Sequence, residues 1–295
     1  MKPKADSQLF YFTLTTLYIL SISAILYLLI DNWSYYASSP ELRLRMAKHD
    51  VLKPSGLIGQ GIGILGSLMM VLLLAYSLRK RVKIFSGLGK LNRWLNVHIF
   101  FGIIGPLLVT MHTAFKFNGI VAVSFWSMVA VALSGFIGRY IYVQIPRNIH
   151  GQQLSMKEME LVDQEFNREL IEKFNFSEEM IKEIESLAKV PKEKSEKSFG
   201  AIMSLLQHDF AGKARLRQIK NEYVQTFHFP AKKVNQMMKI ARKKAKLERR
   251  IQLLNKVQSI FHYWHIIHKP FAIIMYLIMI IHISVAILFG YTWIF

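Results

Sequence analysis

The sequence predicts an all-α membrane protein: a bundle of five transmembrane helices with a helical cytoplasmic insert between the fourth and the fifth. Of the 295 residues, 52% are hydrophobic and only 19% are charged, a more apolar composition than a soluble chain of this length usually has. The apolar residues are also gathered into five runs, each long enough to cross a hydrocarbon core about 30 Å thick. We expect three parts: spans one to four in residues 1–143, the insert in 144–258, and span five in 259–295.

The first two spans are expected at residues 8–30 and about 56–78. The apolar stretch of the first is longer than the core of a signal peptide, so we expect it to be retained as an anchor. Residues 31–55 are polar, with aromatic side chains suited to a membrane interface. The second span carries a stripe of small residues that favours close helix packing over a nucleotide-binding loop, because no strand precedes it. The members of this stripe are Gly56, Gly59, Gly63 and Gly66.

A basic segment at residues 79–93 sets the expected orientation. It contains six Lys or Arg residues and no acidic residue, and the positive-inside rule places it in the cytoplasm. The third span, 94–115, then runs outward, and the fourth, about 120–143, returns. We therefore expect a multi-pass protein of the bacterial cytoplasmic membrane, with its N-terminus inside and its C-terminus outside.

Residues 144–258 interrupt the apolar pattern. They contain 23 Lys and Arg against 15 Asp and Glu, a net charge of +8, and they read mostly as helix. Ser177, followed by two glutamates, predicts a helix N-cap. Between Lys232 and Lys256, apolar residues recur at helical spacing among the cations, so this helix could lie on anionic membrane lipid or offer a docking face to an acidic partner. A basic face beside a membrane is expected in any case, and we expect no nucleic acid as a partner.

Two pairs of histidines are placed alike on the third and fifth spans, the latter expected at about 264–290. His98 and His112 are 14 residues apart, and so are His268 and His282. On an α-helix fourteen residues return to about the same face and rise roughly 21 Å. Each span would therefore hold one imidazole near each side of the membrane. Two haem b groups held between two helices need this arrangement, because imidazole is a standard axial ligand of haem iron.

Small residues lie on the face of the first histidine pair. Gly102 and Gly105 fall at steps of four and seven from His98 and would leave room for flat macrocycles, although glycines also serve tight helix packing. The same steps on the fifth span give Ala272 and Met275, one small and one adaptable.

The fifth span opens with further histidines. His265 lies about 100° from the face of His282, so His268 fits the ligand role better and His265 is the reserve candidate. The chain has no cysteine, which removes iron–sulfur clusters, thiolate zinc sites and covalently attached haem. Any redox centre must therefore depend on histidine or be non-covalent.

The expected topology pairs His98 with His268 on the inner side and His112 with His282 on the outer side. Cations at the inner interface are placed to meet the propionates of an inner haem, and Lys116 could serve the outer one. The inner cations are Arg93, Arg139 and Lys269. Ordinary positive-inside bias explains these three equally well.

A bundle with histidine pairs on its third and fifth spans resembles the ferric-reductase-like transmembrane superfamily, which includes the membrane domains of NADPH oxidases and ferric reductases. The resemblance covers the spans only, and four residues carry it: His98, His112, His268 and His282. The cytochrome b/b6 group has histidine pairs at a similar spacing, on its second and fourth spans. The resemblance implies two haem b groups and electrons that cross the membrane between them.

The chain departs from that family in two ways. No flavin or nicotinamide domain follows span five, and the insert is unusually long. We therefore expect an electron-transfer subunit of a membrane oxidoreductase, with an external acceptor and a donor that is an acidic cytoplasmic redox protein, a dehydrogenase subunit or quinol. Bis-histidine ligation leaves no open position on iron, which favours electron transfer over substrate binding.

Other functions remain open at this point. One alternative is a cytochrome b subunit that oxidises quinol or reduces quinone, although no motif points to a quinone. From a different class, a helical transporter with histidines serving protons would be expected to have acidic residues within its spans, and the five spans contain none. A membrane scaffold with structural histidines is the third alternative.

Overall fold

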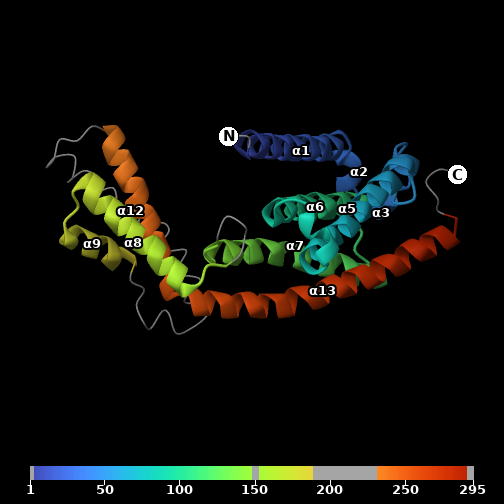
Figure 1. Ribbon diagram of the computed structural model, residues 1–295. Helices are drawn as coiled ribbons and strands as arrows, with labels where there is room; N and C mark the ends of the chain where they lie inside the picture. The colour runs from blue at the N-terminus through green and yellow to red at the C-terminus, as the bar shows by residue number, and fades with distance from the viewer. Residues whose placement is uncertain (1–2, 148–152, 189–230, 291–295) are drawn as a thin grey trace. The chain divides into compact units, whose positions relative to one another are not determined.

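The computed structural model describes residues 3–147, 153–188 and 231–290 (Figure 1). In these residues the secondary structure is helical, without a strand, apart from an isolated bridge between Arg147 and Gln153. Five of the described helices are long and apolar enough to cross a membrane. The predicted all-α class is therefore confirmed, and a helix long and apolar enough to cross a membrane is present at each of the five predicted spans. The chain divides into two compact units, which are described separately.

The first unit comprises Met1–Phe136 and Ile266–Phe295. Its long helices begin and end within a few residues of the predicted spans, except that the last one starts about ten residues early. The described helices of this unit are α1 (Pro3–Asp31), α2 (Trp33–Ala37), α3 (Pro40–Arg43), α4 (His49–Leu52), α5 (Leu57–Arg81), the 3-10 helix η1 (Lys83–Gly87), α6 (Leu91–His112), most of α7 (Ile120–Gln144) and the later part of α13 (Leu254–Leu288).

Helices α5 and α6 pack against each other through the glycine stripe of α5. Gly63 and Gly66 are buried, and a Cβ atom on Gly66 would lie 3.0 Å from Cγ2 of Val109. A Cβ atom on Gly63 would collide with the ring of His112. The prediction of a close-packing stripe is confirmed at these two positions, because a larger residue would push the two helices apart.

A buried arginine closes the C-terminal end of α6. The helix ends because Ala114 and Phe115 adopt left-handed φ angles of 46° and 59°. The Arg43 side chain donates hydrogen bonds to the main-chain oxygens of Ala114, of Tyr36 at 2.7 Å and of Ser38 at 3.0 Å. A cation at a helix C-terminus stabilises the last carbonyls and the negative end of the helix dipole. Arg43 thereby fastens the segment between the first two spans to the end of α6.

A few polar contacts connect α1, α7 and α13 with other helices of this unit. At the start of α6, Arg93 forms an ion pair with Asp6 of α1 at 3.2 Å. On α13, the Tyr276 hydroxyl donates to the main-chain oxygen of Met70 at 2.6 Å. The hydroxyl of Ser124, on α7, donates to the Met275 oxygen at 3.0 Å. Most large apolar side chains of α1 and α13 are exposed, as expected of surfaces that face lipid.

The second unit comprises Ile137–His265. It contains the end of α7, the start of α13 and three further described helices, which are α8 (Met156–Phe174), α9 (Glu178–Ala188) and α12 (Ala231–Gln252). The predicted N-cap is confirmed, since the Ser177 hydroxyl accepts a hydrogen bond from the Met180 amide at 3.3 Å. Helix α13 begins before the predicted span because its first turns pack in this unit, where Leu254 and Val257 are buried.

The apolar face of α12 lies in the core of the second unit. Val234, Met237 and Ala241 are each about 1% exposed and cluster with Leu170 of α8 and Ile184 of α9. The apolar residues at helical spacing that the sequence shows are therefore used for internal packing.

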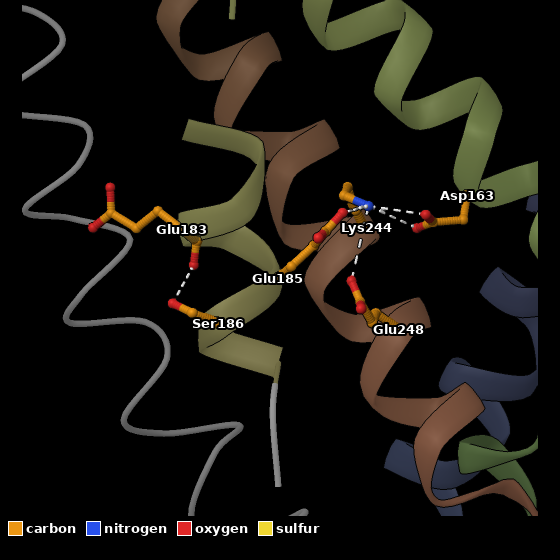
Figure 2. Close-up of polar contacts among 6 residues, drawn as sticks. All are labelled: Asp163, Glu183, Glu185, Ser186, Lys244 and Glu248. Carbon is orange, nitrogen blue, oxygen red and sulfur yellow. Dashed lines mark hydrogen bonds and ion pairs between the residues drawn. The ribbon is translucent and has the colours of Figure 1, made fainter. Parts of the chain in front are cut away.

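One lysine inside this unit joins three helices (Figure 2). The side chain of Lys244, on α12, is fully buried and forms ion pairs with Asp163 of α8 at 2.9 Å and with Glu185 of α9 at 3.1 Å. Glu248, one turn further along α12, lies 3.8 Å away. The three carboxylates are a fifth to a third exposed, so they retain part of their hydration while they neutralise the buried ammonium group.

The pKa of Lys244 reflects two opposing effects. Burial lowers it, but hydrogen bonds from the ammonium group to Asp163 and Glu185 outweigh burial, and the pKa is raised above its ordinary value. A group whose pKa is higher in the folded state contributes its full stability below the pKa of the unfolded state. This contribution is therefore complete at neutral pH and is lost only as an alkaline pH rises through the folded pKa.

Replacement of Lys244 by methionine should destabilise the second unit. The change leaves Asp163 and Glu185 facing a buried site without a cation, which costs on the order of 3 kcal/mol in comparable ion pairs. Hydrogen exchange of the amides of α8, α9 and α12, in the full-length protein in detergent, measures the loss. Lys243→Met removes an exposed charge from the next position and should change stability by less than about 0.5 kcal/mol. Equal effects of the two substitutions would contradict the role of Lys244.

Candidate functional site

All four histidines of the predicted pairs lie in the first unit. His98 and His112 belong to α6, and His268 and His282 belong to α13. The first three are half-buried, whereas His282 is exposed.

Helix α5 holds both histidines of α6. Nδ1 of His98 lies 3.1 Å from the main-chain oxygen of Leu73, and Nδ1 of His112 lies 2.8 Å from that of Gly59. A carbonyl oxygen can only accept a hydrogen bond, so Nδ1 carries the proton in both rings and Nε2 presents its lone pair. The two acceptors are themselves 14 residues apart on α5. Helix α5, which runs antiparallel to α6, therefore holds the two rings at two positions along the helix axis, as far apart as the two histidines themselves.

A serine fixes the ring of His268 in the same tautomer. The Ser134 hydroxyl lies 2.8 Å from the main-chain oxygen of Val131 and 2.6 Å from Nδ1 of His268. A hydroxyl has one hydrogen, which Ser134 donates to the carbonyl, so its oxygen accepts from Nδ1 of His268. His268 therefore also presents the lone pair of Nε2.

The two members of the predicted outer pair belong to the same unit, His112 on α6 and His282 on α13. The inner pair is anchored to different neighbours, His98 to α5 and His268 to α7. The structure thus positions three of the four imidazoles from the main chain or side chain of an adjacent span.

The donor chemistry of these residues fits haem iron. Histidines that ligate a metal almost always donate their other ring N–H to a carbonyl or a polar side chain, which fixes the tautomer and raises the basicity of the ligand nitrogen. His98, His112 and His268 show this pattern. Among the described residues no group of three or more His, Cys, Asp or Glu side chains is arranged to hold a metal ion. A bis-histidine haem needs only two protein ligands, whereas structural zinc needs four.

The glycines of α6 have different surroundings. Gly105 is buried against α5, with its Cβ position 3.1 Å from Sδ of Met70, so its small size serves helix packing. A Cβ atom on Gly102 would lie 3.8 Å from Cδ2 of Leu73, an ordinary van der Waals contact, so this glycine is not required for helix packing. On α13, Met275 is buried and Ala272 is partly exposed.

The predicted propionate partners have different surroundings. Arg93 forms its ion pair with Asp6 and lies over the Phe10 ring at 5.2 Å. Lys269 and Lys116 are exposed. Arg139 belongs to the second unit, where its guanidinium lies 5.8 Å from the Tyr142 ring centroid.

The reserve ligand is engaged by its own helix. Nδ1 of His265 donates to the main-chain oxygen of Phe261 at 2.8 Å, and the ring packs edge-on against Phe261 and Trp264. His265 belongs to the second unit, whereas the other candidates belong to the first.

Sequence reasoning missed the residues that hold the rings. Gly63 admits the ring of His112, and the glycine stripe was a visible signal of close packing without indicating what it packs against. Ser134 is one of three serines on α7, and nothing in its spacing distinguishes it from the other two. The acceptors at Gly59 and Leu73 are main-chain carbonyls, which every residue has, so the sequence could not identify them.

No protein-family model, no curated protein and no solved structure matches this chain. The resemblance to ferric-reductase-like proteins therefore stands on the four histidines and their spacing.

The hydrogen bonds predict one tautomer for three histidines in protein free of haem. ¹⁵N NMR of full-length protein labelled at histidine should show Nδ1 protonated and Nε2 unprotonated in His98, His112 and His268. Ser134→Ala should change the signals of His268 alone. Ser124→Ala removes another serine hydrogen bond between α7 and α13 and should leave them unchanged. An Nε2-protonated ring at His98 or His112 would contradict the geometry.

Proposed function

We propose that this chain is a di-haem b-type cytochrome, an electron-transfer subunit of a membrane oxidoreductase that connects a cytoplasmic donor with an external acceptor. The observation that supports it best is the matched spacing on two helices. His98 and His112 are held by acceptors 14 residues apart on α5, so two Nε2 lone pairs are presented at two levels roughly 21 Å apart.

The histidines have distinct roles in this proposal. His98 and His268 hold the inner haem, and His112 and His282 hold the outer one. Haem held by these residues would supply one-electron redox chemistry. Leu73, Gly59 and Ser134 keep the rings oriented through their hydrogen bonds to Nδ1.

The remaining site residues follow from this assignment. Lys269 and Arg93, which belong to the first unit, are assigned to the inner propionates, and exposed Lys116 is assigned to the outer ones. In this proposal the N-terminus and residues 144–258 lie in the cytoplasm, and the C-terminus lies outside. The apolar side chains of the spans keep ions and water from the path between the two levels, so electron transfer moves charge across the membrane.

Fixed tautomers favour this proposal over a proton-carrying transporter. A proton relay needs rings that gain and lose protons and reorient. Nδ1 of His98 and of His112 is bonded to a main-chain carbonyl, and Nδ1 of His268 to a hydroxyl that already donates elsewhere. Rings held in this way suit a ligand that must stay in place.

Gly63→Ala should selectively weaken the outer haem. The new methyl group meets the His112 ring and displaces it from Gly59. The haem content of purified protein, measured as the pyridine haemochrome, should fall from two toward one per chain. Gly135→Ala is the matched control, because a Cβ atom there meets nothing within 4 Å, and it should retain both haems. Full occupancy in Gly63→Ala would contradict the assignment of His112.

Electron transfer across a sealed membrane tests the function itself. Liposomes containing the protein receive a reductant inside and a membrane-impermeant ferric chelate outside. Reduction of the chelate should occur with the unaltered protein and with His262→Ala, which replaces an exposed histidine outside the predicted pairs. It should be abolished by His98→Ala, His112→Ala, His268→Ala or His282→Ala. Haem-loaded protein that passes no electrons would refute the proposal, and loss with His265→Ala but not His268→Ala would reassign the inner ligand.

A further inference from the structure

Helix α12 has two chemically different faces. Its apolar residues and the ammonium group of Lys244 are buried against α8 and α9. Arg249 is also buried, and Arg250 reaches Gln144 at 3.4 Å. The sequence shows a helix rich in cations, and the structure separates those used inside the unit from those presented outside.

The outer face carries an unbroken row of cations, here termed the cationic stripe. Its members recur at steps of three, four or seven residues and span 14 residues, roughly 21 Å of helix. All are exposed, and none forms an ion pair with another described residue. Glu248, the acidic residue of α12, is turned toward Lys244. The stripe consists of Lys232, Lys239, Arg242, Lys243 and Lys246.

The insert carries an excess of cations beyond the stripe. Residues 189–230, which lie outside the described part of the chain, contain eight Lys and Arg against four Asp and Glu. A partner rich in carboxylates would therefore complement the charge of the stripe and of the insert as a whole.

We infer that the cationic stripe is the docking surface for an acidic soluble electron-carrier protein. The inference rests on the proposed function, because bis-histidine iron has no open position for a small substrate and must exchange electrons with another redox group. Complementary charge raises the encounter rate of such partners. Redox complexes use small, weakly held interfaces that permit rapid turnover. After Leu253, α12 is followed directly by α13, the helix that carries His268.

An acidic protein fits the stripe better than a lipid surface does. A helix that lies in a membrane interface buries an apolar face among the lipids and keeps its cations at the rim. The apolar face of α12 is already buried in the second unit, and the exposed residues between the cations are the polar Asn235 and Gln236. Charge is the only attraction that the stripe retains, and carboxylates on a protein surface complement it.

The test uses full-length, haem-loaded protein in nanodiscs of zwitterionic lipid. Reduced flavodoxin, an acidic flavoprotein, is the probe, and stopped-flow absorbance gives the second-order rate constant of haem reduction at low salt. Lys239→Gln/Lys243→Gln should lower this constant about tenfold. Lys157→Gln/Lys182→Gln removes two exposed lysines from α8 and α9, an equal change of charge, and should lower it less than about twofold. The difference should shrink at high salt.

Haem reduction by reduced lumiflavin, a small-molecule electron donor, separates the two proposals. It should proceed equally in all variants, which would show that the haems are intact. Equal slowing of the flavodoxin reaction in both double variants would overturn the docking surface, because net charge alone would then explain it. A second result would also overturn the docking surface: the unaltered protein binds anionic vesicles, and Lys239→Gln/Lys243→Gln abolishes this binding without changing the rate of reduction by flavodoxin. That result would identify lipid as the occupant of the stripe. Protein without haem would overturn the proposed function and this inference together.

Discussion

Two hydrogen bonds from imidazole rings to the main chain of α5 determine the geometry of the first unit. Inside a membrane an imidazole N–H finds no water, so it must meet an acceptor on a neighbouring helix. The carbonyls of Leu73 and Gly59 can serve His98 and His112 only if α5 and α6 approach closely. The buried glycines of α5 permit that approach, and Gly63 in particular leaves the space that the His112 ring occupies. The glycine stripe of α5 and the histidine spacing of α6 therefore serve the same requirement, which is a hydrogen-bond acceptor for each buried ring N–H.

The two units solve the burial of polar groups in different ways. In the first, main-chain oxygens receive the ring N–H groups, the guanidinium of Arg43 and the hydroxyl of Tyr276. In the second, carboxylates from α8, α9 and α12 surround the ammonium of Lys244 (Figure 2). Carboxylates would be costly within hydrocarbon, whereas main-chain carbonyls are present at every turn. The polar interior of α12 also explains how a helix with so many cations can pack against its neighbours while it presents a separate charged face.

Much of this architecture is encoded in local patterns. The length of the apolar runs predicted the spans, and a serine followed by two glutamates predicted the start of α9. Glycines at steps of three and four residues predicted the packing face of α5. Other features depend on contacts between distant segments. Lys244 differs from Lys243 only by its place on the helix face, and Ser134 is one of several serines on α7. Gly105 lies on the same face of α6 as the two histidines, yet it packs against Met70 of α5. Part of the histidine face is therefore covered by a neighbouring helix. Spacing identified the four histidines, and only the structure shows how their rings are held.

The central claim is that two irons are each held by two imidazoles. Electron paramagnetic resonance of the oxidised, purified protein tests it most directly, because the spin state reports the axial ligands without a donor or an acceptor. We predict two low-spin ferric haems per chain and loss of one of the two signals in His112→Ala. A high-spin signal of similar intensity in the unaltered protein, or protein that binds no haem when haem is supplied during expression, would contradict the account.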